Sequence, residues 1–197
     1  MKNKMTLICF LCVVSCYNLL NAQKNEKTSA IYDYTERTLN NTDTIPDFDS
    51  KVNKLKITGT IYKKDGKTPA QDVILYICQP DENGDYEMRK DSKRKRYVHH
   101  RAWIKTDADG RYTFYTFIPG DNNYVKELKQ IQRIVKVPGQ SEQELNSFFF
   151  NDDPLLPDLT LECRALVVQS MLRLEKKDGM FLANRDFKVD IKVPNIQ

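Results

Sequence analysis

Short runs with β-type periodicity, separated by turn residues, are the feature that most constrains the fold of this 197-residue chain. From Leu55 to Tyr62 apolar and polar residues alternate, and the run stops at the turn pair Asp65-Gly66. The next run, Val73–Cys78, is almost wholly apolar, as expected of a strand that is buried on both faces. Six further strands are predicted, at Ala102–Thr106, Tyr112–Phe117, Ile131–Val137, Leu145–Phe150, Met180–Leu182 and Phe187–Val193.

This spacing of strands and turns favours an all-β fold, an antiparallel sandwich or barrel. The segment Asp107-Ala108-Asp109-Gly110 predicts a hairpin connection between its flanking strands, with glycine where a positive φ is needed. Only the segment 159–174 has a nearly helical period. We expect a short helix there, with one face formed by Leu161, Ala165, Val168 and Leu172.

The N-terminal segment is typical of an export signal. Lys2 and Lys4 precede an apolar run from Met5 to about Leu20, and the small residue Ala22 precedes polar sequence. About 16 interrupted apolar residues fall short of the roughly 20 that a transmembrane helix needs. We expect an exported protein, periplasmic or secreted, with residues 1–22 cleaved after Ala22 or with a lipid anchor at Cys16 as its one contact with a membrane.

Removal of residues 1–22 lowers the formal net charge from +4 to about +2, because Lys2 and Lys4 leave with the signal. This small charge argues against a nucleic-acid partner. The polar segment 23–50 is expected to be a tether or an extended N-terminal arm, and 51–197 a single β-sandwich domain. Of the five cysteines, Cys78 and Cys163 remain, either paired in an oxidising compartment or free.

Several segments between residues 55 and 157 resemble the intradiol ring-cleavage dioxygenases, the catechol and protocatechuate dioxygenases, in their exported bacterial branch. They are Lys56-Ile57-Thr58-Gly59-Thr60, Asp65-Gly66-Lys67-Thr68-Pro69-Ala70, Val73-Ile74-Leu75-Tyr76, Arg101-Ala102-Trp103-Ile104-Lys105-Thr106-Asp107, Gly110-Arg111-Tyr112-Thr113-Phe114 and Asn151-Asp152-Asp153-Pro154-Leu155-Leu156. They occur in the order and at about the spacing of that family. The resemblance implies a β-sandwich that holds one non-haem Fe(III) between two tyrosinates and two histidines.

The resemblance also implies where the four iron ligands lie. Tyr86, after the turn Asp81-Glu82-Asn83-Gly84-Asp85, matches the first tyrosine. The second tyrosine falls on Asn122, with Tyr124 two places along as a weak alternative. The His-x-His pair falls on Gln130 and Gln132, and the substrate-side arginine on Glu127.

A glutamine amide oxygen is a neutral, weak donor and cannot replace an imidazole nitrogen. We therefore expect no cofactor, and Fe(III) only if the family's activity survives, in which case Tyr86 is the metal ligand. The retained role would be to bind a small polar or aromatic ligand, or a structural one. The alternative is an active Fe(III) dioxygenase that cleaves a catechol-like aromatic.

The remaining candidates are a histidine pair and a basic segment. His99 and His100 are expected on the strand that leads to Trp103, where neighbouring side chains face opposite ways, so that they cannot jointly replace a His-x-His pair. The segment 89–101 carries seven basic residues, which are Arg89, Lys90, Lys93, Arg94, Lys95, Arg96 and Arg101. It is expected to be a solvated loop, and the alternative is a surface-interaction module that binds anions.

Overall fold

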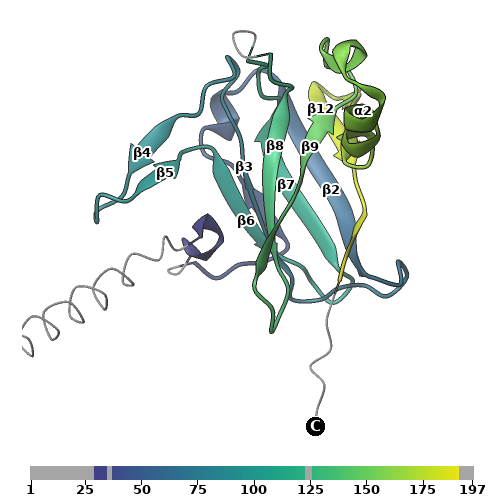
Figure 1. Ribbon diagram of the computed structural model, residues 1–197. Coiled ribbons are helices and arrows are strands. Elements are labelled where there is room, and N and C mark those ends of the chain that lie inside the picture. The colour runs from purple at the N-terminus through teal and green to yellow at the C-terminus, as the bar shows by residue number, and fades with distance from the viewer. Residues whose placement is uncertain (1–28, 35–36, 123–125, 191–197) are drawn as a thin grey trace, which may run out of the picture.

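The computed structural model describes residues 29–34, 37–122 and 126–190. Two β-sheets pack face to face, and a small two-stranded sheet projects beside them (Figure 1). The strands are β1 (Thr42–Thr44), β2 (Lys54–Lys63), β3 (Ile74–Cys78), β4 (Met88–Lys90), β5 (Arg96–Val98), β6 (Arg101–Lys105), β7 (Arg111–Phe117), β8 (Gln130–Lys136), β9 (Glu142–Phe150), β10 (Met171–Leu172), β11 (Glu175–Lys177), β12 (Met180–Asn184) and β13 (Phe187–Val189). All eight predicted strands are present, which confirms the all-β sandwich; beyond Asp190, the last of them lies outside the described residues.

The first sheet has the strand order β1-β7-β2-β12-β11, with β13 also paired to β2, and the second has the order β10-β9-β8-β3-β6. The pairs β2–β7, β3–β6, β3–β8 and β8–β9 are antiparallel, as predicted. Four other pairs are parallel: β1–β7, β12–β2, β13–β2 and β10–β9. The sheets are therefore mixed, because several chain segments return to a sheet edge through long connections and not through hairpins.

The main core lies between these two sheets. On β2, Leu55, Ile57 and Ile61 are fully buried and alternate with residues that are half-buried. They face Leu75 and Ile77 of β3, which are also fully buried. Burial of such a side chain contributes about 1.5–3 kcal/mol, so the period of two in the sequence fixes which face of each strand points inward.

The turn at Asp107–Gly110 joins the two sheets. The carboxylate of Asp107 accepts hydrogen bonds from the backbone amides of Asp109 and Arg111 at 3.0 and 2.9 Å, and Gly110 has a φ of 69°. The predicted turn is correct, but the predicted hairpin is wrong, since β6 and β7 belong to different sheets. Turn residues reverse the chain without selecting the partner of the next strand.

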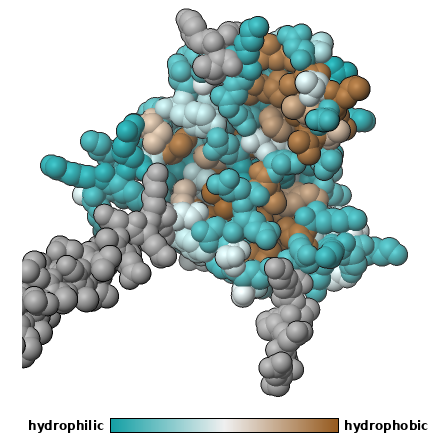
Figure 2. Space-filling model, in the orientation of Figure 1, coloured by the Kyte–Doolittle hydropathy of each residue, from teal (hydrophilic) through white to brown (hydrophobic). Residues whose placement is uncertain are grey.

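One short α-helix, α2 (Leu161–Val168), is present among the described residues, within the segment where a helix was predicted. The helix ends before Leu172, which lies in β10, and its predicted apolar face is turned to solvent: Leu161 is 82 % and Val168 53 % exposed, whereas Val167 is buried. Figure 2 shows hydrophobic surface gathered around this part of the molecule. Cys163 on this helix is exposed and Cys78 on β3 is buried, and both are free thiols.

The polar N-terminal segment packs on the sandwich as an extended arm over the described part of residues 29–50. It carries two 3-10 turns, η1 (Ala30–Tyr32) and η2 (Phe48–Ser50), and its strand β1 pairs with β7. A third 3-10 turn, η3 (Leu156–Asp158), follows β9. Ile31 and Ile45 of the arm are buried, and the backbone carbonyl of Ala30 accepts a hydrogen bond from the indole of Trp103 at 3.3 Å.

The predicted export signal, with Ala22 and Cys16, lies outside the described residues. Within the described ranges, none of the helices has the length and apolar character to cross a membrane.

Candidate functional site

Three of the predicted iron-ligand positions meet at one small cavity. Two loops close it, because Gly84 and Gly120 let their backbones touch: a Cβ on Gly120 would lie 2.3 Å from the carbonyl oxygen of Glu82. The cavity measures about 10 Å³, and its lining includes Tyr86, Asn122, Glu127 and Gln130. Such a volume holds roughly one water molecule.

Gln132 does not join this cavity. The pairing of β8 with β9 shifts register between Ile131 and Arg133, and Gln132 is exposed. Its amide oxygen accepts a hydrogen bond from the thiol of Cys78 at 3.5 Å, whereas the amide of Gln130 donates to the carboxylate of Glu127. The two glutamines therefore contact different partners, although both alternate with the buried Ile131 and Arg133 along β8. Tyr124 lies outside the described residues.

These residues do not fit the ferric ion that the resemblance implies. The hydroxyl of Tyr86 is buried without a hydrogen-bond partner among the described residues. Burial raises its pKa, and the neighbouring Cys78 and Glu127 act in the same direction, so the phenol is neutral in the metal-free protein. Asn122 and Gln130 offer only neutral amide oxygens, whereas hard, highly charged cations select anionic oxygen donors.

A larger cavity of about 590 Å³ lies on the face of β3 and β8 that is turned away from the main core. The hairpin β4–β5 and the arm contribute to its walls. Its lining combines aromatic and apolar residues (Tyr76, Met88, Tyr97, Val98, Ile134) with charged and polar ones (Asp33, Lys95, Arg96, Arg101, Gln132, Glu142, Glu144). Its volume is in the range that binds small organic molecules.

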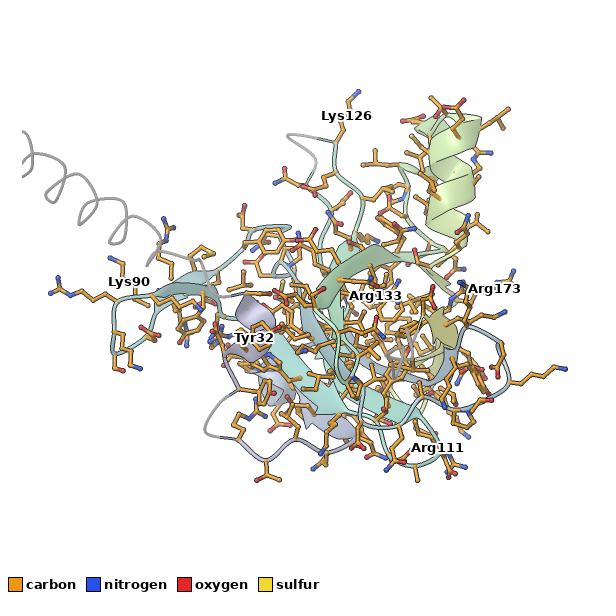
Figure 3. All side chains as sticks on the ribbon, turned by 60° about the horizontal axis from the view of Figure 1, so that its bottom comes forward. Tyr32, Lys90, Arg111, Lys126, Arg133 and Arg173 are labelled. Atoms are coloured by element: carbon orange, nitrogen blue, oxygen red, sulfur yellow. The ribbon has the colours of Figure 1, made fainter. Side chains whose placement is uncertain are left out.

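The basic segment 89–101 forms the hairpin β4–β5 and is partly neutralised. Arg89 pairs with Glu87 at 2.7 Å, and Lys95 and Arg101 both pair with Asp33, at 2.6 and 3.0 Å. Figure 3 shows Lys90 pointing from this hairpin into solvent. The predicted solvated segment is thus an ordered hairpin that has ion pairs at its base.

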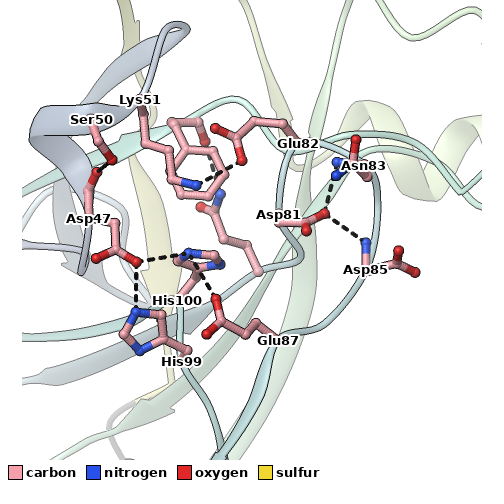
Figure 4. Close-up of polar contacts among 12 residues, drawn as sticks. Asp47, Ser50, Lys51, Asp81, Glu82, Asn83, Asp85, Glu87, His99 and His100 are labelled. Atoms are coloured by element: carbon pink, nitrogen blue, oxygen red, sulfur yellow. Dashed lines mark hydrogen bonds and ion pairs between the residues drawn. The ribbon is translucent and has the colours of Figure 1, made fainter.

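The two histidines form the second place where titratable side chains converge. His99 and His100 lie in a bend between β5 and β6, not within a strand. The expectation that they face opposite ways is wrong, because the strict alternation of side chains ends where the strand ends. Their ring centroids are 5.1 Å apart, and both rings approach Asp47 (Figure 4).

Asp47 and Glu87 complete a cluster with these histidines, which we call the His99–His100 cluster. The Nε2 atom of His99 is 2.8 Å from Oδ2 of Asp47, and Nε2 of His100 is 3.7 Å from the same oxygen and 3.9 Å from Oε2 of Glu87. The hydrogen bond from His99 lowers the pKa of Asp47, and the one from Arg89 lowers that of Glu87. Both carboxylates are therefore ionised at neutral pH.

His100 is the most enclosed member of the cluster. Its side chain is 2 % exposed and packs edge-on against the ring of Phe117 at 5.0 Å. Burial lowers the pKa of His100, with Lys51 and His99 acting in the same direction, so the imidazole is neutral at pH 7. Neither of its ring nitrogens has a hydrogen-bond partner among the described residues, a state that costs about 1–3 kcal/mol for each buried polar atom.

This cluster is difficult to predict from the sequence. The His-His dipeptide is visible, but Asp47 is separated from His99 by 52 positions, in a segment that looks like a polar arm. Asp47 has a left-handed backbone, with a φ of 64°, at the start of η2. That conformation, and the pairing of β1 with β7, bring the carboxylate to the histidines.

Comparison with known proteins agrees with the observed fold. No family model and no curated protein matches the sequence. Among solved structures, the dioxygenase domain of a dioxygenase–carbohydrate-binding protein fusion from Streptomyces sp. SirexAA-E is similar with a TM-score of 0.61 and 19% identity, over 78% of this chain and 89% of that one. An intradiol ring-cleavage dioxygenase from Tetranychus urticae gives 0.61 and 15%, over 79% and 88%.

The catechol 1,2-dioxygenase of Acinetobacter radioresistens is similar with a TM-score of 0.59 and 14% identity, over 78% of this chain but only 58% of that one. The chain therefore has the intradiol ring-cleavage dioxygenase fold. At these identities the likeness defines the fold and not the activity.

Proposed function

We propose that this chain is an exported protein of the intradiol dioxygenase fold that does not cleave catechols and acts by binding. The observation that carries the proposal is the donor set at the iron position. Of the four implied ligand positions, only that of Tyr86 has a side chain that ferric iron favours, and Gln130 is already engaged by Glu127. Gln132 lies outside the site altogether.

The 590 Å³ cavity supports a binding role. It places Gln132 and the rings of Tyr76 and Tyr97 at one surface, with acidic and basic side chains around them. Aromatic walls bind flat apolar rings, and the charged groups select polar substituents. The ligand class is therefore a small aromatic molecule with polar groups, which this protein would hold without oxidising.

The decisive experiment is reconstitution of the purified protein with Fe(III), followed by absorption spectroscopy and oxygen uptake with catechol. We expect no tyrosinate-to-iron absorption band and no ring cleavage. Binding of catechol to the iron-free protein, measured calorimetrically, should weaken when Tyr97 is replaced by alanine. Loss of affinity in Tyr97→Ala but not in Tyr86→Phe would assign binding to the larger cavity.

The alternative, an active ferric dioxygenase, makes the opposite prediction. A red band with stoichiometric iron, lost in Tyr86→Phe and kept in Tyr97→Phe, would refute the proposal. A third function, anion binding by the hairpin β4–β5, predicts steep salt dependence that disappears when Lys93 and Arg94 are neutralised.

A further inference from the structure

We propose that Asp47, Glu87, His99 and His100 form a binding site for a divalent transition-metal cation, represented by zinc. The site is distinct from the iron position of the fold, whose remnant cavity is lined by Tyr86 and Gln130. It uses two imidazole nitrogens and two carboxylates, drawn from the arm, from the residue before β4 and from the bend between β5 and β6.

The donor atoms are close enough for one ion. One ligand atom from each of the four residues lies within 4.8 Å of the others. Two ligands of a single zinc ion are at most about 4.2 Å apart, since each bond is about 2.1 Å long, and about 3.4 Å apart in a tetrahedron. The separations of 3.7 and 3.9 Å at His100 are near that spacing and too long for hydrogen bonds. The two His100 pairs reach the tetrahedral spacing by a contraction of about 0.3–0.5 Å, and a pair at the 4.8 Å limit does so by about 1.4 Å.

The two carboxylate side chains are exposed enough to move, whereas the two histidine side chains are not. His99 and His100 are 9 % and 2 % exposed and so are fixed by packing, whereas Asp47 and Glu87 are 47 % and 40 % exposed. The two carboxylates can therefore move onto an ion that enters from solvent, while the histidines hold their places.

His100 provides the observation that a hydrogen-bond network alone does not explain. A simple Asp47–His99 pair accounts for the 2.8 Å contact. It leaves the His100 ring buried and aimed at two carboxylate oxygens that it does not reach by hydrogen bonding. A cation among these atoms would be bound by the Nε2 atom of His100. It would also neutralise the negative charges of Asp47 and Glu87.

The chemistry of the donors selects the class of metal. Imidazole with carboxylate suits zinc and its first-row neighbours, whereas calcium and magnesium prefer all-oxygen sites. Two carboxylates balance the charge of a divalent ion. The nearby cation Lys51 is held by Glu82 at 2.8 Å, which offsets its repulsion of a bound metal.

The test is zinc binding by the full chain after chelation and dialysis, with all thiols alkylated so that cysteines contribute nothing. We expect one zinc ion per chain by equilibrium dialysis and metal analysis. Asp47→Asn and His100→Gln should each lower the affinity at least tenfold. Asparagine keeps the left-handed backbone of position 47 accessible, so Asp47→Asn removes a charge without disturbing the turn.

Asp49→Asn is the matched control, because Asp49 is exposed on the same 3-10 turn and lies outside the cluster. It should bind zinc as the unchanged protein does. Cobalt in place of zinc should give visible bands without a thiolate charge-transfer feature. The proposal is overturned if the chain binds less than one equivalent of zinc, or if Asp47→Asn and His100→Gln bind it as tightly as Asp49→Asn does.

Discussion

Arg133 of β8 is a charged residue buried in the core, and its replacement gives a quantitative test of the packing. Its side chain lies inside the sandwich (Figure 3) and is 5 % exposed, 3.9 Å from the ring centroid of Phe148 and 5.0 Å from that of Phe187. Its Nε and Nη2 atoms donate to the backbone carbonyl of Asn146, and its Nη1 atom has no partner among the described residues. No acidic group pairs with it in the described ranges.

The energetic terms at Arg133 nearly cancel. Burial lowers the pKa of the guanidinium to about 10, roughly 2.5 below its ordinary value, which corresponds to a cost of roughly 3 kcal/mol for keeping the charge. Against this cost stand a charge-assisted hydrogen bond, about 1.5–3 kcal/mol, and the aromatic contacts, about 2 kcal/mol. Arg133→Met removes the cost of burying the charge, and it also removes the hydrogen bond and the cation–π contacts. We expect it to lower the free energy of unfolding by about 0–2 kcal/mol.

Arg133→Ala should cost roughly 2–5 kcal/mol more than Arg133→Met, because it also leaves a cavity between the sheets. Chemical denaturation with circular dichroism measures both values, and the exposed Arg173→Met should change stability by less than about 0.5 kcal/mol. If the methionine variant loses as much stability as the alanine variant, the polar contacts of the guanidinium dominate and the reasoning fails.

Three further predictions concern a close approach, the arm and the metal cluster. Gly59→Ala places a Cβ 2.1 Å from the carbonyl oxygen of Arg185 and should destabilise by about 3 kcal/mol or more, whereas Gly139→Ala, with open space around it, should cost about 1 kcal/mol; equal losses by denaturation would contradict the close approach. The hydroxyl of Tyr32 donates to Glu142 at 2.6 Å, which raises the pKa of Tyr32 to about 12 and lowers that of Glu142. This contribution to arm docking is full between the unfolded-state pKa values, about 4.3 and about 10, and is lost as pH rises through about 12 or falls through the lowered pKa of Glu142. The fluorescence of the single tryptophan, Trp103, should report these two losses, and Tyr32→Phe should remove both; an unchanged profile would show that other contacts hold the arm. Zinc at 100 times its Kd should stabilise the chain by about 2.7 kcal/mol and raise Tm by roughly 5–10 °C. At the same zinc concentration the gain should fall to about 1.4 kcal/mol or less in Asp47→Asn and stay unchanged in Asp49→Asn.

The strands were predictable because their signals are local. The alternation along Leu55–Tyr62 records which side of β2 is buried, and the apolar run Val73–Cys78 records a strand inside a sheet. Partner choice was not predictable in the same way. Asp107–Gly110 carries correct turn chemistry, yet the chain passes from one sheet to the other there, because pairing depends on contacts far apart in sequence.

The candidate sites show the same division. The match of Tyr86, Asn122 and Gln130 to one site in sequence corresponds to one cavity in space. Gln132 does not line that cavity although burial alternates without a break along β8, because its side chain contacts Cys78 of β3 whereas Gln130 contacts Glu127. The contact of Gln132 with Cys78 joins residues 54 positions apart, so the separation of the two glutamines becomes visible only in the structure.

Residues of the N-terminal arm, which in sequence look like a tether, make specific contacts with the sandwich. Its carboxylate Asp43 accepts the backbone amide of Trp103 at 2.9 Å, and Asp47 reaches the histidines four residues later. Tyr86 and Glu87, neighbours in sequence, contribute to different places: Tyr86 lines the small cavity at the implied iron position, and Glu87 joins the His99–His100 cluster. One set of strands thus positions both the cavity at the implied iron position and the proposed zinc site. The cavity at the implied iron position and the proposed zinc site should therefore be independent. Tyr86→Phe should leave zinc affinity unchanged. A loss of zinc binding in that variant would mean that the two places form one site.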